Sequence, residues 1–329
     1  MTDLPQTMRA WRIEEITDPP TMKLVNIPVP APAADQYLLR MEAAGLAFGD
    51  TLVVRGKYQL KPTPPFTPGS EAVGVIVAGN GPLAIGTRVC SSSRFGSYAE
   101  YAVVPQSEAV EIAGDLPAVA ALALRSNYPT SLFALREAGH LKAGETLLVH
   151  AGAGGVGAAA VQLGKLLGAR VIATAGGPEK VQACLDIGAD AAIDYRNADW
   201  VSEVRALAPD GVDVIYDPVG GEVGVQSLRC LAFCARYLVI GFAGGALTQL
   251  PANRLLLHNA SAIGVLWGEV RKRDLALAAK LTSEVYGWFG EGKLAPPSGP
   301  DYPFEQVQEA LRALEGRTTI GKVALRIAD

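Results

Sequence analysis

The sequence has 329 residues, of which 49% are hydrophobic, enough to fill the cores of about two domains. Its 29 Lys and Arg residues are opposed by 33 Asp and Glu residues, giving a net charge of −4, and it contains no basic run. This composition excludes a disordered chain and offers no electrostatic footprint for nucleic acid or an anionic membrane. We therefore expect a small-molecule partner.

The sequence predicts neither a signal peptide nor a membrane span. Residues 1–10 contain no apolar core of the kind that a signal peptide needs. The uncharged stretch 146–164 contains five glycines together with His150 and Gln162, which disfavour insertion into lipid. We expect no membrane association and a cytoplasmic location.

Short strands separated by proline and glycine occupy residues 8–110, a pattern typical of an antiparallel, barrel-like β domain. The predicted strands are Met8–Ile16, Met22–Val29, Tyr37–Ala47, Ala72–Ala78, Gly86–Ser91 and Ser97–Val104. Between them, Gly56–Gly69 holds four prolines and is expected to form an ordered loop. Loops held by a rigid scaffold often carry functional residues.

A helical pattern, interrupted at 127–131, covers 116–135 and precedes the most informative stretch, Thr146–Gly168. This stretch predicts a buried strand (Leu147–His150), a glycine turn and an alanine-rich helix. The turn contains Gly152, Gly154, Gly155, Val156 and Gly157. The spacing G-x-G-x-x-G in this context predicts a dinucleotide site, in which the N–H groups of the helix N-terminus face the pyrophosphate. The alternative is a glycine turn that only reverses the chain.

Strands and helices then alternate, which predicts a doubly wound parallel sheet. The expected elements are strand Arg170–Ala175, helix Pro178–Ile187, strand Ala191–Tyr195, helix Asp199–Leu207, strand Val212–Asp217, helix Glu222–Leu231, strand Tyr237–Gly241 and strand Ser261–Leu266. A helix over 271–289, a loop over 292–303, a short helix over 304–314 and a strand over 321–327 follow. We expect an α/β protein in which residues 1–125, completed by 267–329, enclose a nucleotide domain at 126–266.

These segments together resemble the zinc-free medium-chain dehydrogenases/reductases, in particular the quinone oxidoreductase (zeta-crystallin-like) family. The matching stretches are DTLVVRGKY at 50–58, FTPGSEAVG at 66–74, SYAEYA at 97–102, KAGETLLVHAGAGGVG at 142–157, IGFAGG at 240–245 and GKVAL at 321–325. The resemblance implies a GroES-like catalytic domain, a Rossmann domain, and hydride transfer from a nicotinamide cofactor to a quinone or an activated C=C bond. An enoyl-thioester reductase and an NADPH-binding protein with little turnover are the alternatives.

A metal site is not expected. Zinc-dependent relatives have histidine in a G-H-E segment where this chain has Gly69, Ser70 and Glu71, and they have a four-cysteine lobe that this chain lacks. Glu71 is instead expected to pair with another side chain. The four cysteines form no C-x-x-C pair, and we expect them to be buried free thiols.

The cofactor is expected to be NADPH. NAD sites place an acid at the end of the second strand, about 20 residues after the first glycine. Here that region reads Ala173-Thr174-Ala175-Gly176-Gly177, and Thr174 is taken as a cofactor-binding candidate. Lys180, Tyr195 and Arg196 offer cations and a hydroxyl to a 2′-phosphate, although the two cations could equally be ordinary solvated charges.

The resemblance also implies roles for individual residues. Tyr58 matches a proton-donating tyrosine of related enoyl-thioester reductases, with packing against the cofactor as the alternative role. The remaining matches are to cofactor-site residues: Asp50, Thr130, Phe242, Leu266 and Lys322. Asp50 could instead be a helix N-cap, and Ala47 stands where the family usually has asparagine. Strands 238–242 and 262–266, if they form the sheet edge, predict a homodimer.

Overall fold

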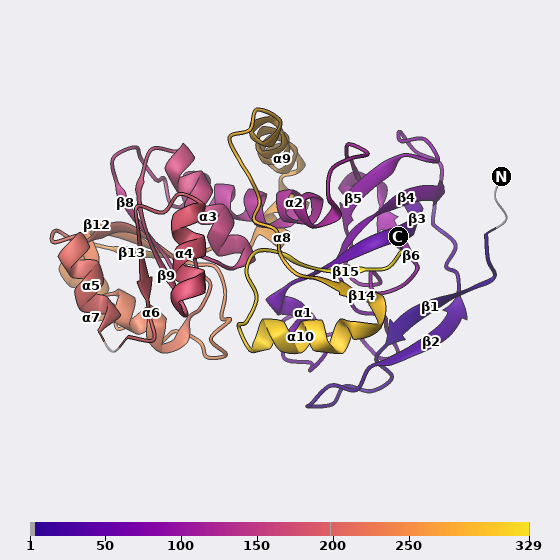
Figure 1. Ribbon diagram of the computed structural model, residues 1–329, viewed down its shortest axis with the longest axis horizontal. Coiled ribbons are helices and arrows are strands. Elements are labelled where there is room, and N and C mark those ends of the chain that lie inside the picture. The colour runs from indigo at the N-terminus through magenta and orange to yellow at the C-terminus, as the bar shows by residue number, and fades with distance from the viewer. Residues whose placement is uncertain (1–3, 198, 329) are drawn as a thin grey trace. The chain divides into compact units, whose positions relative to one another are not determined.

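The computed structural model describes residues 4–197 and 199–328, and its contacts group into two units (Figure 1). One unit contains residues 1–126 and 298–329, and the other contains residues 127–297. The division differs from the expected one, because residues 267–297 belong to the second unit. Contacts such as the ion pair of Arg136 with Glu284 and the hydrogen bond of Gln162 with the backbone of Ala295 hold that segment there.

The first unit is built on a seven-stranded sheet with the path β14-β15-β3-β4-β5-β7, in which β6 also pairs with β3. All of its pairs are antiparallel except β14 with β15. The strands are β3 (Gln36–Leu46), β4 (Glu71–Ala78), β5 (Arg88–Ser92), β6 (Tyr101–Pro105), β7 (Val110–Glu111), β14 (Asp301–Pro303) and β15 (Val323–Arg326), and a separate hairpin joins β1 (Thr7–Arg12) to β2 (Lys23–Pro28).

Two helices cover parts of this unit, α1 (Phe48–Val53) and α10 (Val307–Glu315). In α10 the buried residues Val307, Ala310 and Leu311 recur at the spacing of one helical face and join the core of the sheet. The loop between α1 and β4 contains no regular element, as its prolines predict. The antiparallel β architecture expected for residues 8–110 is therefore present.

The second unit contains a six-stranded, wholly parallel sheet in the order β10-β9-β8-β11-β12-β13. Its strands are β8 (Thr146–Val149), β9 (Arg170–Ala175), β10 (Ala191–Asp194), β11 (Val212–Asp217), β12 (Leu231–Val239) and β13 (Ser261–Gly264), and its helices are α3 (Gly155–Leu166), α4 (Pro178–Asp186), α5 (Trp200–Leu207), α6 (Gly221–Ser227), α7 (Ala252–His258), α8 (Trp267–Arg273) and α9 (Leu275–Gly290). The strand order reverses at β8, which has β9 on one side and β11 on the other.

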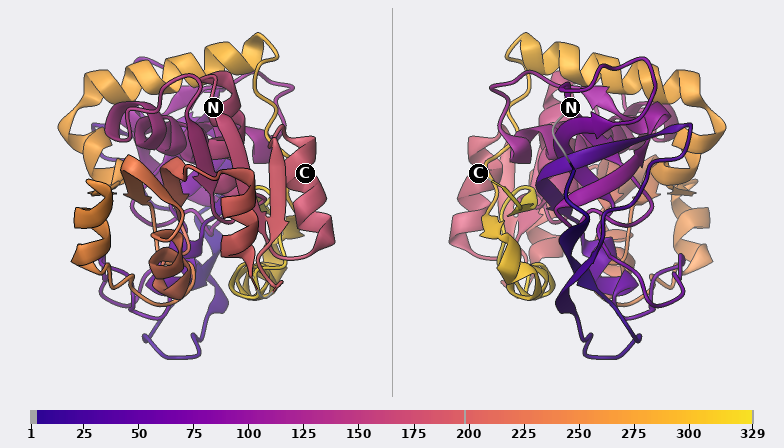
Figure 2. Two further views of the ribbon diagram at one scale, coloured as in Figure 1. Left: turned by 90° about the vertical axis from the view of Figure 1, so that its left-hand side faces the viewer. Right: turned by 90° about the vertical axis from the view of Figure 1, so that its right-hand side faces the viewer.

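Helices cover both faces of this sheet, as the left view of Figure 2 shows. Gly164 of α3 lies against Leu147, whereas Trp200 of α5 packs in the cluster that contains Leu148. Neighbouring residues of a strand point to opposite faces, so α3 and α5 lie on opposite faces. The doubly wound arrangement expected from the sequence is confirmed.

Two helices differ from the expected elements. Helix α2 (Ala118–Leu132) runs without a break through Pro129 and continues as a π-helix over Phe133–Ala138, although an interruption at 127–131 was expected. Its buried side chains, including Leu124 and Tyr128, stabilise the helix against the proline.

The single helix expected over 271–289 is in fact two helices, α8 and α9. Asp274 separates them, because its carboxylate accepts a hydrogen bond from the N–H of Leu277 at 2.9 Å and caps α9. The short helix α7 and strand β14 were not predicted.

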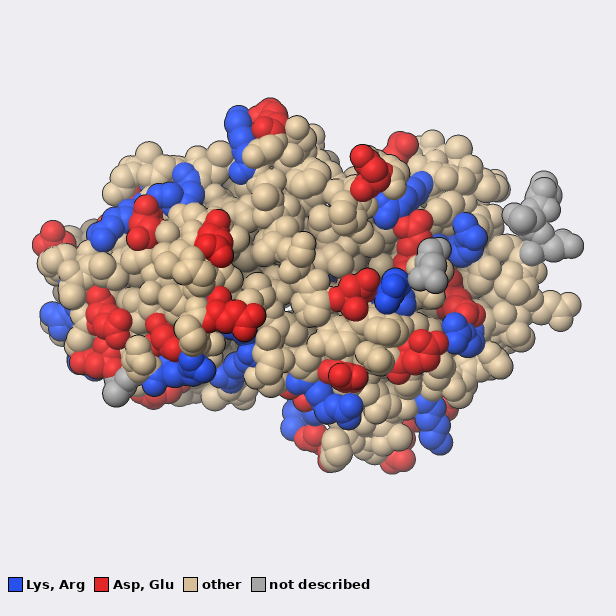
Figure 3. Space-filling view, in the orientation of Figure 1, with Lys and Arg blue, Asp and Glu red and all other residues tan. Residues whose placement is uncertain are grey.

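Two expectations about the surface and the thiols can be compared with the structure. No helix within residues 4–197 and 199–328 has the length and hydropathy that a membrane span requires. On the face shown in Figure 3, acidic and basic side chains are interspersed. Cys90, Cys184 and Cys230 are buried free thiols, but Cys234 is exposed, so the expectation was wrong for that residue.

Candidate active site

The glycine turn joins the carboxyl end of β8 to the N-terminus of α3. A Cβ on Gly152 would lie 2.8 Å from the Cβ of Ala173, and a Cβ on Gly157 would overlap the carbonyl of Ala151. The N–H of Gly152 donates to the carbonyl of Thr174 at 2.9 Å, which ties the turn to β9. The turn is therefore close-packed, and α3, a 12-residue helix, begins at Gly155 with its first N–H groups available to an anion.

A chain of buried hydrogen bonds lies next to this turn. The Nδ1 of His150 lies 2.8 Å from the hydroxyl of Thr174, and its Nε2 lies 2.7 Å from the hydroxyl of Ser227. Ser227 donates its proton to the carbonyl of Val223, so Nε2 donates to Ser227, and Nδ1 accepts from Thr174. Burial lowers the pKa of His150, which keeps the ring neutral. The Thr174 side chain is thus engaged with His150.

The end of β9 has the composition expected of an NADPH site. Gly176 and Gly177 follow the strand, and no acid is present there. A Cβ on Gly176 would lie 2.6 Å from the hydroxyl of Tyr195, and one on Gly177 would lie 2.6 Å from Nη2 of Arg196, so these two side chains flank the turn. Lys180 belongs to α4, which begins at Pro178, directly after Gly177.

An acid does occur one strand further along, at Asp194 of β10. Its carboxylate accepts from the N–H of Gly177 at 3.0 Å and forms an ion pair with Arg196 at 2.8 Å. The Arg196 guanidinium holds the pKa of Asp194 below its usual range. Asp194 therefore orients Arg196 across the Gly176–Gly177 turn, a role that was not predicted. Its position in the sequence, two residues before Arg196, is the feature that could have identified this role.

A second turn follows β11 and places Phe242. The carboxylate of Asp217 accepts from the N–H groups of Val219 (2.7 Å) and Gly220 (3.0 Å) and from the hydroxyl of Tyr237. A Cβ on Gly220, whose φ is 72°, would lie 2.7 Å from the ring of Phe242. Asp217 was not among the predicted site residues.

Of the two remaining predicted residues of this unit, Leu266 lies at the same edge of the sheet. Leu266 is 53% exposed and precedes α8, just after β13, and Thr130 lies in α2. The segments after β8, β10, β12 and β13 carry most of the residues predicted for this unit, whereas Thr174 lies in β9 and Lys180 in α4. Ligands of doubly wound sheets bind at this carboxyl edge, where the strand order reverses.

Tyr58 and Asp50 lie together in the first unit. The ring of Tyr58 packs on Gly49, where a Cβ would lie 3.7 Å from its hydroxyl. Burial, followed by the charge of Asp50, raises the pKa of Tyr58, so the phenol is protonated at neutral pH. Asp50 is buried and is the third residue of α1, not its N-cap; its carboxylate accepts from the N–H of Ala47 at 2.8 Å. Burial raises the pKa of Asp50 to about 6.

Asp50→Asn is expected to raise the free energy of unfolding at pH 7 by about 1–3 kcal/mol. Between about pH 4 and 6 the folded state binds the Asp50 proton more tightly than the unfolded state, so wild-type stability falls as the pH rises through this window. Asparagine keeps the acceptor for Ala47 without the charge. Urea unfolding across this pH range should show a flatter profile in the variant. The control Asp35→Asn, at an exposed position, should change neither the free energy of unfolding at pH 7 nor its dependence on pH. An unchanged pH dependence in Asp50→Asn would contradict the prediction.

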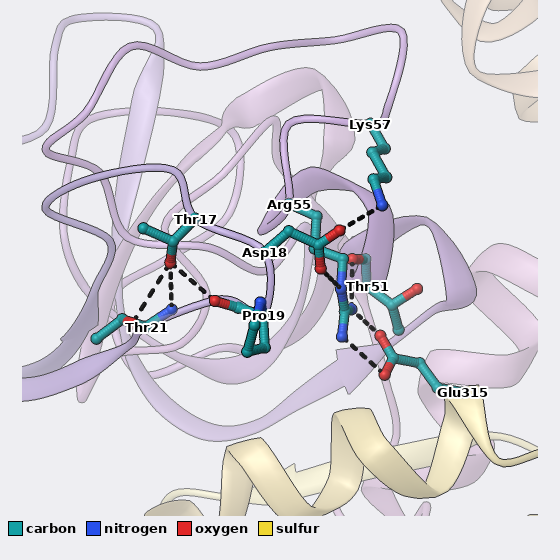
Figure 4. Close-up of polar contacts among 8 residues, drawn as sticks. All are labelled: Thr17, Asp18, Pro19, Thr21, Thr51, Arg55, Lys57 and Glu315. Carbon is teal, nitrogen blue, oxygen red and sulfur yellow. Dashed lines mark hydrogen bonds and ion pairs between the residues drawn. The ribbon is translucent and has the colours of Figure 1, made fainter.

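Ion pairs hold the segment that leads to Tyr58 (Figure 4). Arg55 bonds Asp18 at 3.0 Å, the carbonyl of Thr51 at 3.1 Å, and the carboxylate of Glu315 in α10. Lys57 pairs with Asp18 at 2.5 Å. These contacts join the loop to the segment before β2 and to α10, so the residue before Tyr58 is anchored.

Lys322, a predicted cofactor residue, is 3% exposed and forms an ion pair with Glu71 at 2.5 Å. The pair fits because residue 45 is glycine, whose Cβ would lie 3.0 Å from Cε of Lys322. Lys322 is therefore the ion-pair partner of Glu71, which was expected from the sequence to pair with another side chain. Within residues 4–197 and 199–328 no three His, Cys, Asp or Glu side chains are grouped so that they could hold a metal ion.

Two family models match the chain. The alcohol dehydrogenase GroES-like domain matches residues 33–114, and the zinc-binding dehydrogenase domain matches residues 155–284, starting in the glycine turn. Quinone oxidoreductase-like protein 2 of Rattus norvegicus is 34% identical over 325 residues, which cover 97% of this chain and 92% of the relative. The chain belongs to the quinone oxidoreductase family of medium-chain dehydrogenases/reductases.

Solved structures of this quinone oxidoreductase family agree with the fold. The quinone oxidoreductase of Thermus thermophilus, described with its NADPH complex, has a TM-score of 0.86 at 32% identity and covers 97% of this chain and 100% of its own. A mycobacterial protein complexed with NADPH has a TM-score of 0.91 at 31% identity, with the same coverage. The first unit therefore carries the GroES-like domain, and the second carries the Rossmann-type domain.

Proposed function

We propose that the protein is an NADPH-dependent, zinc-independent oxidoreductase that reduces a quinone or an activated C=C bond. The observation that carries the proposal is the end of β9, where two glycines, flanked by Tyr195 and Arg196, replace the acid of an NAD site. The residues present fit the cofactor: the glycine turn would hold the pyrophosphate, and Tyr195, Arg196 and Lys180 would hold the 2′-phosphate. The mycobacterial relative was solved in complex with NADPH, and the Thermus thermophilus quinone oxidoreductase also forms a complex with NADPH.

When bound, NADPH supplies a hydride for the acceptor, and the chain supplies the proton that completes the reduction. Tyr58 is proposed as the proton donor, because its hydroxyl is protonated at neutral pH. Glu71 has a lysine as its ion-pair partner, which favours a structural role over metal binding. In this proposal the acceptor is activated by hydrogen-bond donors instead of a metal ion.

Cofactor consumption tests the proposal directly. NADPH and NADH absorbance would be followed with 1,4-benzoquinone, 9,10-phenanthrenequinone, methyl vinyl ketone and crotonyl-CoA. Faster turnover with NADPH on the quinones or the enone supports it, whereas turnover confined to crotonyl-CoA would indicate an enoyl-thioester reductase. NADPH binding without turnover on any acceptor would indicate a binding protein. Activity that requires added zinc after chelation would contradict the zinc-independent part.

Arg196→Ala is expected to weaken NADPH binding by about 10- to 150-fold and to leave NADH binding nearly unchanged, because a charge-assisted contact to the 2′-phosphate is lost. Titration of both cofactors gives the two dissociation constants. Arg205→Ala, an exposed arginine of α5, is the matched control. An equal loss of affinity for NADPH and NADH would show that Arg196 does not bind the 2′-phosphate.

We also propose a homodimer formed through the second unit. Strand β13 is the sheet edge, and its side chains are mostly exposed. Leu256 and Leu257 of the neighbouring α7 are 80% and 70% exposed. An exposed edge beside apolar side chains favours pairing with a second copy.

Light scattering is expected to show twice the chain mass of 34.4 kDa, about 69 kDa, and Leu257→Lys is expected to shift the protein toward the monomer. Ile85→Lys, which places the same charge on an exposed apolar residue of the first unit, should leave the mass unchanged. A wild-type mass of one chain would refute the dimer.

A further inference from the structure

The amide of Asn127 is buried against the glycine turn without a partner for its oxygen. Asn127 lies in α2 and is 8% exposed, and its Oδ1 has no hydrogen-bond partner among the residues that the structure describes. A Cβ on Gly155, the first residue of α3, would lie 2.9 Å from Nδ2 and 3.3 Å from Oδ1. The amide therefore lies directly over the N-terminus of α3.

A buried amide oxygen without a partner is unfavourable for the folded protein by itself. An apolar side chain at position 127 would leave no hydrogen-bonding group unpaired. An unpaired polar group is therefore informative when it lies at a helix N-terminus that is itself open to a ligand, since ligand binding can supply the missing partner.

The chemistry of Oδ1 restricts what that partner can be. The oxygen accepts hydrogen bonds only, and phosphate oxygens at the helix N-terminus have no proton to donate at neutral pH. The partner must carry an O–H or N–H group. In a dinucleotide, the groups of this kind next to the pyrophosphate are the ribose hydroxyls.

Contacts one helical turn further along α2 show which half of the dinucleotide is involved. Ser131 donates to the carbonyl of Val156 at 3.0 Å, and its hydroxyl lies 2.8 Å from that of Tyr216 in β11. Helix α2 thus approaches α3 from the β11 side of β8. The Gly176–Gly177 turn lies on the other side, after β9. A dinucleotide spans these two sides, with its adenosine half at β9.

We propose that Asn127 binds the nicotinamide riboside half of the cofactor, with Oδ1 accepting from a ribose hydroxyl. This inference rests on the proposed dinucleotide function and adds to it a residue that the glycine motif does not contain. Asn127 is a cofactor-binding residue at a position where the cofactor-free protein keeps an unsatisfied polar atom.

Asn127→Leu separates binding from folding, because leucine has a similar size and no polar atom. We expect it to weaken NADPH binding by about 3- to 10-fold, as the loss of one hydrogen bond predicts. Binding of 2′,5′-ADP, which lacks the nicotinamide riboside, should change by less than about twofold. The denaturation midpoint of the cofactor-free variant should equal or exceed that of the wild type.

The controls make each result decisive. Arg196→Ala should weaken the binding of NADPH and of 2′,5′-ADP alike, because both carry the 2′-phosphate. Asn80→Leu, at an exposed loop position, should change the binding of neither ligand. Unchanged NADPH binding by Asn127→Leu, or equal losses for both ligands, overturns the inference. If Asn127→Leu does not fold, Asn127→Ala is titrated with the same two ligands and judged by the same ratio.

The outcome for Asn127 can be distinguished from failure of the proposed cofactor preference. A wild-type protein that binds NADH more tightly than NADPH contradicts the preference, and the variants are then compared with NADH, which has the same nicotinamide riboside. A wild-type protein that binds neither dinucleotide overturns both proposals.

Discussion

Tyr58→Phe is expected to lower kcat with an enone acceptor by about 10²- to 10⁴-fold, the range for loss of a general acid. The hydroxyl is the only group removed, and the ring keeps its packing on Gly49. The dissociation constant of NADPH should therefore stay the same. Stopped-flow and steady-state rates with methyl vinyl ketone, together with a cofactor titration, measure these quantities.

Two comparisons give this test its meaning. Tyr101→Phe, a half-buried tyrosine of β6, controls for the loss of any phenol in the first unit. The solvent deuterium isotope effect reports whether proton transfer limits the rate. A kcat within about twofold of wild type would assign Tyr58 a packing role and make water the proton donor.

Lys322→Met is expected to destabilise the protein by about 3–5 kcal/mol, because it leaves the carboxylate of Glu71 buried without a partner. The two side chains of this pair are 2% and 9% exposed, so solvent cannot replace the ammonium. Urea unfolding of the variant and the wild type measures the loss.

The double variant Lys322→Met with Glu71→Gln should recover most of the stability, since neither charge remains. Lys272→Met, which breaks an exposed pair with Glu269, should cost at most about 1 kcal/mol. The folded double variant also tests the sequence expectation for Lys322. Weakened NADPH binding would support direct contact with the cofactor, and unchanged binding would leave Lys322 with the ion pair alone. A loss of less than about 1 kcal/mol in the single variant would contradict the buried-charge argument.

The glycine turn could be predicted because the requirement for glycine is local. Gly152 and Gly157 are packed against residues of the same strand-turn-helix unit and of the next strand, and the spacing along the chain reflects that packing. The parallel sheet was predictable for a similar reason, since strands buried on both faces are apolar throughout. The missing acid after β9 could also be read directly from Ala175-Gly176-Gly177.

Contacts between distant residues could not be predicted in this way. Asn127 precedes Gly155 by 28 positions, and nothing in the surrounding helical pattern shows that its oxygen lacks a partner. The continuity of α2 through Pro129 depends on the packing of the helix, which overrides the local preference of proline. The break at Asp274 was a different case, because an aspartate followed by an apolar run is a recognisable cap.

The divided chain of the first unit affects the order in which the protein can fold during synthesis. Strand β15 pairs with β3, and Lys322 neutralises Glu71, so the first unit lacks an inner strand and a buried countercharge until residues 298–329 have been made. The second unit is continuous from 127 to 297 and needs no later segment. Domains generally fold in order from the N-terminus. Here, however, we expect the nascent chain to complete its Rossmann-type unit first, because the β strands made earlier still lack the segment that begins at residue 298.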